Sequence, residues 1–238
     1  MIRNYIFDLY GTLVDIRTEE AMPALWRRMA LLYSFQGADY GPEELRQGYR
    51  AAVEAQIERR AVDHPAILKD HIEPEILDVF RALYKEKAVS PSQPTVQDTA
   101  LFFRTLSMRH LRLYPQAAAV LKELRNRGQG VYLLSNAQAA FTVPELNKLG
   151  LAYLFDGVVL SSDVGIKKPD SALFWHILQR YGLDPAECLM IGNDREADMW
   201  GAAAVGMAGR YIHTKQSPPR PDRLPETCRE IDSLRDLL

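Results

Sequence analysis

Side chains that could carry out hydrolytic chemistry follow a short apolar run near the start of the chain. Asp8 comes directly after Ile6 and Phe7, and Gly11 stands three residues later. In open parallel α/β sheets the ligand crevice lies beyond the carboxyl ends of the strands, and a glycine there lets the backbone approach a substrate closely. A carboxylate at such a strand end can act as a nucleophile; alternatively, Asp8 caps a turn.

Polar groups also follow later apolar runs of the chain or lie between them: Ser135, Asn136, Lys168, Asn193, Asp194 and Asp198. Desolvating these groups together serves no purpose in an apolar core. An aspartate nucleophile, in contrast, needs a cation and hydrogen-bond donors that hold the substrate anion, which Lys168, the hydroxyl and the amide supply. Asp194 and Asp198 offer hard oxygen ligands for Mg²⁺ beside Asp8.

The composition describes a globular chain without a dominant charge. Its 238 residues, 47% hydrophobic and 25% charged, suffice for one sizeable domain plus an insertion or a small second domain. The formal charge is −2, so no overall field favours nucleic acid or a membrane, and the expected partner is a small anionic substrate. Two cysteines and the lack of a long apolar stretch predict a cytoplasmic protein. No oligomeric state follows from the sequence.

Hydrophobic periodicity predicts a strand over residues 2–7, then about a hundred residues with helical patterns. Helices are predicted near residues 25–35, from Pro42 onward, and over residues 73–84 and 95–110. A proline-punctuated connection at residues 89–94 separates the last two. We interpret this interval as an inserted four-helix bundle.

Strands and helices alternate after the insertion. Further strands are predicted over residues 130–135, 157–161, 188–192 and 210–212, and helices from Pro115 to about Gly128 and over 171–181 and 195–205. A nearly continuous apolar strand, such as 130–135, is typical of a sheet covered on both faces. The alternation predicts an α/β fold with a parallel sheet, and residues 217–225 are predicted to form a proline-rich surface loop.

Four sequence blocks together resemble the motifs of the haloacid dehalogenase-like (HAD) hydrolase superfamily. They are DLYGT at residues 8–12, SN at 135–136, VGIKKP at 164–169 and GNDREAD at 192–198. Each block is weak alone, whereas the ordered set is specific. The resemblance covers the whole chain and implies a Rossmann-like core of residues 1–14 and 112–238, with a C1-type helical cap over residues 15–111.

The resemblance also implies roles for the matching residues. Asp8 would be the nucleophile that forms an aspartyl ester, and Thr12 would orient the first loop. Ser135 and Asn136 would bind the substrate anion or the leaving oxygen, and Lys168 would neutralise the charge cluster. The acidic fourth block contains Asn193, Asp194 and Asp198.

Tyr10 departs from the pattern of the family's phosphatases, in which a second aspartate serves there as general acid and then as base. Tyrosine, with an unperturbed pKa near 10, is a poor proton shuttle at neutral pH. Tyr10 resembles instead the first block of the family's 2-haloacid dehalogenases, where a halide leaves without an acid. Residues 24–27 also resemble a dehalogenase stretch, so Arg27 is a candidate for holding a carboxylate or halide; alternatively, it is a solvated helix charge.

The fourth block resembles the metal-holding form of the phosphatases, whereas the dehalogenase branch works without metal. Asp8, the Tyr10 carbonyl and either Asn193 or Asp194 could hold Mg²⁺ together with waters. Asp198 would cap the next helix or, in the dehalogenase interpretation, help to activate water.

Three functions therefore remain open. The first is a Mg²⁺-dependent phosphatase of a small phosphomonoester. We favour it because we give the metal-holding fourth block with Asp194 more weight than the dehalogenase-like Tyr10. The second is a metal-independent L-2-haloacid dehalogenase, and the third is a catalytically weak protein that binds anions. The predicted catalytic residues are Asp8, Tyr10, Thr12, Lys168 and Asp198.

Overall fold

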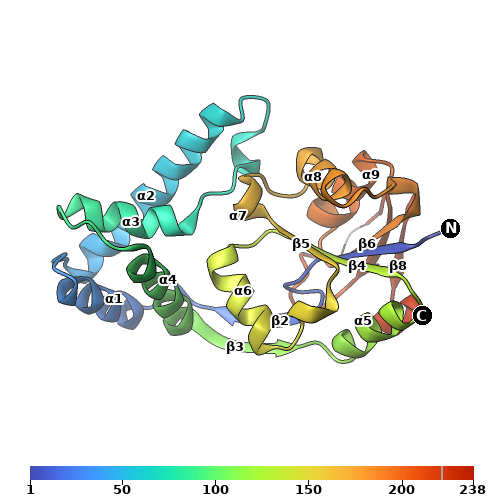
Figure 1. Cartoon of the computed structure of the whole chain (residues 1–238), viewed down its shortest axis with the longest axis horizontal. Helices are drawn as coiled ribbons and strands as arrows, with labels where there is room; N and C mark the ends of the chain where they lie inside the picture. The colour runs from blue at the N-terminus through green and yellow to red at the C-terminus, as the bar shows by residue number, and fades with distance from the viewer. Residues whose placement is uncertain (221) are drawn as a thin grey trace.

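A computed structural model describes residues 1–220 and 222–238 of the chain. Figure 1 shows an α/β core that holds both chain ends and, beside it, a group of four helices. The chain leaves the core through strand β2 (Val14–Thr18) and returns through strand β3 (Met108–Leu113), and these two strands pair antiparallel. The helical part is therefore an insertion held on a two-stranded ribbon.

The core contains a parallel six-stranded sheet in the order β5-β4-β1-β6-β7-β8. Its strands are β1 (Asn4–Phe7), β4 (Gly130–Ser135), β5 (Gly157–Leu160), β6 (Cys188–Gly192), β7 (Ala208–Ile212) and β8 (Cys228–Ile231). Phe7 at the end of β1 stands in register with Leu133 of β4 and Ile191 of β6. The strand order reverses around β1, and ligands of such sheets bind where that reversal occurs.

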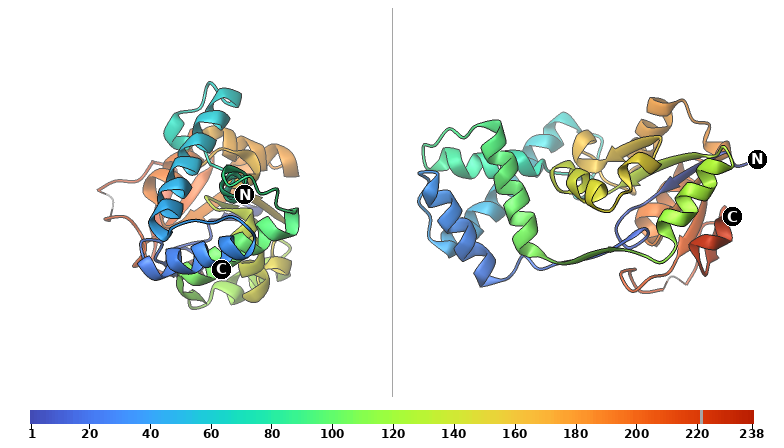
Figure 2. Two further views of the ribbon diagram at one scale, coloured as in Figure 1. Left: turned by 90° about the vertical axis from the view of Figure 1, so that its left-hand side faces the viewer. Right: turned by 60° about the horizontal axis from the view of Figure 1, so that its bottom comes forward.

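Alternating residues of the central strands pack against helices on opposite faces of the sheet. Phe7 and Leu133 belong to the cluster with α5 (Ala117–Asn126) and α6 (Ala139–Lys148). Ile6 and Leu134 belong to the cluster with α8 (Ser171–Tyr181) and α9 (Gly201–Ala204). Both faces are therefore covered, as Figure 2 shows, which explains why these strands are apolar throughout.

The inserted helices α1 (Pro23–Phe35), α2 (Pro42–Asp63), α3 (Ile76–Glu86) and α4 (Gln93–Ser107) form a separate hydrophobic cluster, and we call this part the cap. Phe103 of α4 lies at its centre, with ring centroids 5.3 Å from Tyr49 and Phe80 and 5.8 Å from Trp26. Phe141 of α6 joins the same cluster from the core. The cap therefore packs directly on the core.

The predicted α/β fold with a parallel sheet and an inserted helical part is confirmed. The helix predicted over 95–110 was too long, because α4 ends at Ser107 and the next residues pair with β2. The helix predicted over 73–84 begins only at Ile76, after the Glu75 side chain accepts a hydrogen bond from Leu77 N. The helix predicted over 195–205 is a π-helical turn, Arg195–Trp200, followed by α9.

Several elements were not predicted from the sequence: β2, β3, α6, α7 (Ser161–Val164) and β8. The predicted loop at 217–225 contains no helix or strand in its described part, and residue 221 lies outside the described residues. The predicted domain boundaries at residues 14–15 and 111–112 fall within β2 and β3. In the described part of the chain, no helix is long and apolar enough to cross a membrane.

Candidate active site

Lys168 lies between two carboxylates below the end of the central strand. Its Nζ donates hydrogen bonds to Asp8 Oδ1 at 2.8 Å, Asp198 Oδ1 at 2.6 Å and the Leu134 carbonyl at 2.9 Å. The Lys168 side chain is buried, which disfavours its charge, but Asp198 and Asp8 outweigh this effect and raise its pKa. The lysine is therefore held as a cation beside the predicted nucleophile.

Asp198 is buried and touches the protein on both carboxylate oxygens. Besides the contact with Lys168, its Oδ2 accepts a hydrogen bond from the Asp194 N–H at 3.0 Å. Burial raises the pKa of Asp198, and Lys168 opposes this rise. A Cβ atom at Gly192 would lie 2.1 Å from Asp198 Oδ2, so only glycine leaves room for this carboxylate. Asp198 thus orients Lys168 and the strand end.

The two polar residues at the end of β4, Ser135 and Asn136, form different contacts. Ser135 donates from Oγ to Asp8 Oδ1 at 3.3 Å and is buried. The Asn136 side chain bonds instead to the backbone of Lys168, accepting from its N–H at 2.8 Å and donating to its carbonyl at 3.0 Å. The Asn136 side chain thus fixes the loop that carries the lysine. Asn136 also lines the catalytic cavity, and its contact with substrate stays a prediction.

Thr12 connects the first and the fourth sequence block. Its Oγ1 lies 3.1 Å from Asp8 Oδ2 and 3.2 Å from Asn193 Oδ1. A Cβ atom at Gly11, which has a φ of +88°, would lie 2.4 Å from the Asn193 amide, so the chain turns there without a side chain. The Asn193 side-chain oxygen and the second carboxylate oxygen of Asp8 consequently face the same hydroxyl.

One carboxylate oxygen of Asp194 is bonded to the backbone that follows it. Its Oδ1 accepts hydrogen bonds from the backbone N–H groups of Glu196 at 2.8 Å and Ala197 at 2.9 Å. These are the free donors at the start of the π-helical turn, so Asp194 acts as its N-cap. Of the two residues that the sequence left open as metal ligands, Asn193 shares the Thr12 hydroxyl with Asp8, whereas Asp194 uses one oxygen for this N-cap.

The Tyr10 side chain points toward helix α6. Its hydroxyl donates to Glu145 Oε2 at 2.5 Å and lies 3.0 Å from Thr142 Oγ1. Burial, together with the charge of Glu145, raises the pKa of Tyr10. Arg104 of the cap completes this network, because its Nε donates to Glu145 Oε1 at 2.6 Å. The phenol therefore stays protonated and is already committed to another acceptor.

A cavity of about 220 Å³ brings most of the predicted residues together, and we call it the catalytic cavity. Its lining includes Asp8, Tyr10, Ser135, Asn136, Lys168, Asn193, Asp194 and Asp198. Thr12 does not line this cavity, but its hydroxyl contacts Asp8, which does. Among the described residues, Arg27 lines neither this cavity nor its neighbour on the cap side, since it is exposed on the outer face of α1. The structure therefore does not bring Arg27 to the site.

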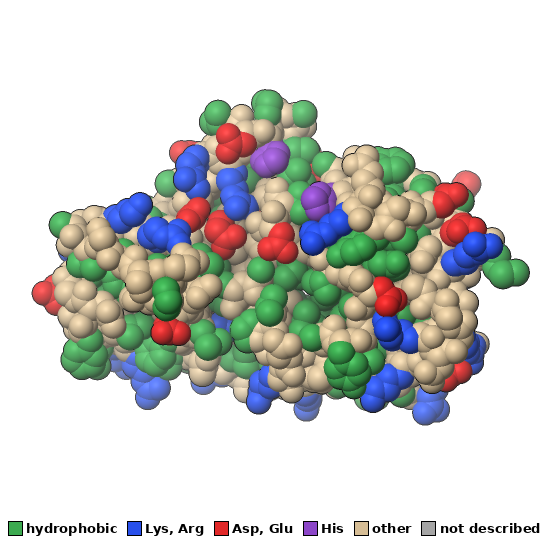
Figure 3. Space-filling view, viewed as in Figure 1, with side chains coloured by type: hydrophobic (Ala, Val, Ile, Leu, Met, Phe, Trp, Pro, Cys, Tyr) green, Lys and Arg blue, Asp and Glu red, His purple; other side chains and the backbone are tan. Residues whose placement is uncertain are grey.

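A second cavity of about 390 Å³, which we call the cap cavity, lies between cap and core and shares Tyr10 and Asn136 with the catalytic cavity. Its lining includes Glu73, Arg104 and Gln138, which sequence reasoning missed. No motif marks them, because they come from α4, from the start of α6 and from the connection before α3. Figure 3 shows acidic and basic side chains side by side where cap and core meet.

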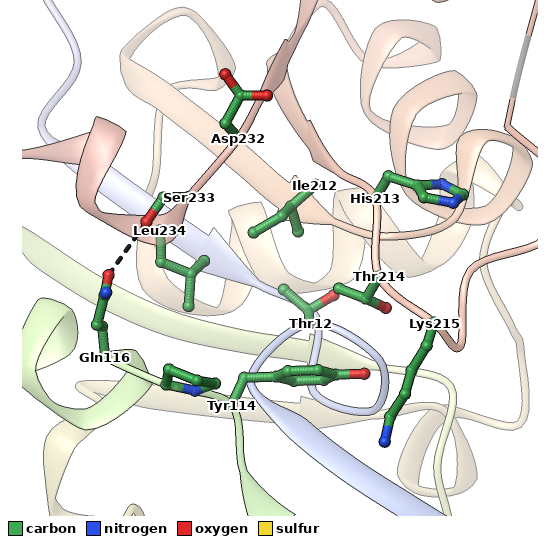
Figure 4. A pocket seen from close by; sticks show the side chains of 11 residues that line it. Thr12, Tyr114, Gln116, Ile212, His213, Thr214, Lys215, Asp232, Ser233 and Leu234 are labelled. Atoms are coloured by element: carbon green, nitrogen blue, oxygen red, sulfur yellow. Dashed lines mark hydrogen bonds between the residues drawn. The ribbon is translucent and has the colours of Figure 1, made fainter.

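A third cavity, of about 270 Å³, lies behind the first loop (Figure 4). Thr12, Tyr114 and Lys215 contribute to its wall. The Thr12 hydroxyl forms its hydrogen bonds with Asp8 and Asn193, and Asp8 does not line this space. The third cavity is thus separate from the catalytic one.

Comparisons with known proteins identify the family of this chain. The family model for haloacid dehalogenase-like hydrolases matches residues 2–206. The chain therefore belongs to the haloacid dehalogenase-like hydrolase family, and it is a hydrolase.

Individual relatives carry different names. A phosphoserine phosphatase of Thermus thermophilus is 34% identical over 148 residues, which cover 62% of this chain and only 58% of that protein. A glyceraldehyde 3-phosphate phosphatase of Methanopyrus kandleri is 26% identical over 100% of this chain and 96% of its own. The solved 2-haloacid dehalogenase of Pseudomonas syringae superposes with a TM-score of 0.66 at 22% identity, covering 100% and 96% of the two chains. The last similarity concerns the fold alone.

The donors beside Asp8 suit a hard cation that keeps most of its waters. In residues 1–220 and 222–238, no group of three or more His, Cys, Asp or Glu side chains is arranged to hold a metal ion. Mg²⁺ needs only one or two protein carboxylates when water and substrate phosphate complete its shell. Asp8 Oδ2 and Asn193 Oδ1 are such oxygens, and both residues line the cavity together with Tyr10.

Proposed function

We propose that this hydrolase is a Mg²⁺-dependent phosphatase that acts on a small phosphomonoester through a covalent intermediate on Asp8. One observation supports the choice: Asn193 Oδ1 and Asp8 Oδ2 lie within 3.2 Å of the same Thr12 hydroxyl, so two oxygens that could hold Mg²⁺ stand next to each other. Bound Mg²⁺ would neutralise charge on the phosphoryl group.

In the first step an Asp8 carboxylate oxygen attacks phosphorus, and the bond from phosphorus to the leaving oxygen breaks. Lys168 and the Ser135 hydroxyl offset the negative charge that gathers around Asp8. In the second step water attacks phosphorus, which releases phosphate and restores Asp8. The protein supplies no strong acid from position 10, because the Tyr10 hydroxyl is bonded to Glu145. We therefore expect faster turnover of esters whose leaving group is a weak base.

The second candidate is hydrolytic dehalogenation of an L-2-haloacid, which Tyr10 favours because a halide leaves without a proton. The carboxylate of the haloacid substrate needs a free cationic side chain in the site. Arg27 is exposed and outside both cavities, and Arg104, which does line the cap cavity, is paired with Glu145. These placements count against the dehalogenase.

The two candidates separate in one assay. Purified protein is given p-nitrophenyl phosphate with Mg²⁺ and then with excess chelator, and 2-chloropropionate in a parallel sample. The proposal expects phosphate release that stops with the chelator. Chloride release that continues with the chelator, without phosphate release, would favour the dehalogenase.

A further inference from the structure

The cap cavity adjoins the catalytic cavity and offers room for the rest of a substrate whose phosphoryl group is next to Asp8. It shares Tyr10 and Asn136 with the catalytic cavity, and its lining also includes Tyr49 of α2 and Phe141 of α6. Its volume of about 390 Å³ suits a small organic group. The chemistry of this wall therefore decides which leaving group fits.

Two carboxylates line the cap cavity without a cationic partner. Glu73 is 9% exposed, and its oxygens accept from neutral donors, Gln138 Nε2 at 2.5 Å and Ser161 Oγ at 2.8 Å. Glu20 lines the same cavity from the connection between β2 and α1. Among the described residues, neither carboxylate forms an ion pair within 4.0 Å of a lysine, arginine or histidine nitrogen.

The single arginine of this wall does not offset these charges. Arg104 donates from Nε to Glu145 Oε1 at 2.6 Å and from Nη2 to Glu145 Oε2 at 3.4 Å. Its guanidinium also lies over the Phe141 ring, 5.1 Å from the centroid. Arg104 and Glu145 thus balance each other, which leaves Glu20 and Glu73 as acidic side chains without an ion-pair partner. Burial raises the pKa of both carboxyls, and a bound cation would favour their charged forms.

We propose that the cap cavity selects phosphomonoesters whose leaving group carries a protonated amine and disfavours those that carry a second anion. An ammonium group there gains from the attraction of both carboxylates. A carboxylate in the same place meets two like charges and no free cation. This selectivity rests on the proposed phosphatase function.

The test compares three phosphate esters of similar size. Phosphoethanolamine carries an ammonium group, propyl phosphate replaces it with a methyl group, and phosphoglycolate carries a carboxylate. Inhibition constants against p-nitrophenyl phosphate hydrolysis are measured for each, and calorimetry gives the same order of affinity without turnover. We expect phosphoethanolamine to bind about tenfold more tightly than propyl phosphate, and phosphoglycolate to bind most weakly.

A matched pair of variants tests the origin of the preference. Glu20→Gln should bring the ratio of the phosphoethanolamine and propyl phosphate constants closer to one. Glu19→Gln changes the neighbouring residue, which pairs with Arg109 outside the cavity, and should leave the ratio as it is in the wild type. Equal binding of the amine and the methyl compound, or tighter binding of phosphoglycolate, would overturn the selectivity. Lack of p-nitrophenyl phosphate turnover would instead contradict the phosphatase function.

Discussion

The Tyr10 hydroxyl lies 2.5 Å from Glu145 Oε2, so the side chain two positions after the predicted nucleophile binds helix α6. Arg104 of the cap donates to the other oxygen of the same carboxylate. Tyr10 thus takes part in the contact between cap and core, and the side chain at position 10 does not serve as a general acid. This relationship accounts for the expected preference for good leaving groups.

Replacing Tyr10 by aspartate should restore a carboxyl group that can protonate a leaving oxygen. We expect Tyr10→Asp to raise the rate on propyl phosphate relative to p-nitrophenyl phosphate by about tenfold or more, since general acid catalysis contributes about a hundredfold or more. Tyr10→Phe removes the bond to Glu145 without supplying an acid and should leave this ratio as in the wild type. An equal ratio in both variants would show that the missing acid does not limit alkyl ester hydrolysis.

Substitutions at the adjacent residues Asn193 and Asp194 should affect the Mg²⁺ requirement differently. Asn193→Asp adds a charged oxygen beside Asp8 and should lower the Mg²⁺ concentration for half-maximal activity by about tenfold. Asp194→Asn keeps an N-cap for the π-helical turn and should change this concentration little. Titrating p-nitrophenyl phosphate hydrolysis with Mg²⁺ measures both. If Asp194→Asn has the larger effect, Asp194 is the ligand.

The ion pair between Arg104 and Glu145 should stabilise the docked cap. Their side chains are 12% and 6% exposed, so Glu145→Leu leaves a buried guanidinium without its partner and should cost about 3 kcal/mol of unfolding free energy. Glu123→Leu removes the exposed partner of Arg127 and should cost less than about 1 kcal/mol. Urea unfolding measures both variants. Similar losses of unfolding free energy in the two variants would mean that the buried ion pair stabilises the protein no more than the exposed one.

Replacing Lys168 by methionine should cause a loss of stability that depends on pH. In Lys168→Met, Asp198 loses the cation that lowers its pKa, while burial and Asp8 still raise it. A carboxyl whose folded-state pKa lies above its unfolded value stabilises the fold at low pH, and this contribution disappears as pH rises through the folded-state pKa. The deficit in melting temperature relative to the wild type should therefore grow from pH 5 to pH 8.

Lys69→Met is the control for this trend, because Lys69 pairs with Glu58 at the surface. Its deficit should be small and nearly constant over the same pH range. A deficit of Lys168→Met that is equal at pH 5 and pH 8 would contradict the charge coupling.

The positions of Asp8, Ser135 and Asn193 could be predicted because each follows an apolar run, and parallel strands end at one edge of a sheet. The directions in which their side chains point could not be predicted from the sequence. Asn193 and Asp194 are neighbours, and only the turn after β6 decides which one faces Asp8.

Long-range partners were beyond sequence reasoning for a related reason. Tyr10 and Glu145 are 135 residues apart and meet only because α6 packs beside the first loop. Helix α6 was itself missed, and it contains Pro144, a residue that usually interrupts helices. Strands β2 and β3 are short, and their pairing across the whole insertion has no local signal.

The proposed phosphatase mechanism requires a covalent bond between Asp8 and phosphorus. The most direct measurement mixes the protein with p-nitrophenyl phosphate and Mg²⁺, quenches it with acid during the first turnover and determines the mass of the peptide that contains Asp8. We predict one phosphoryl group on Asp8 in the wild type, and neither this group nor turnover in Asp8→Asn. A phosphoryl group on another residue, or unchanged turnover in Asp8→Asn, would contradict the account.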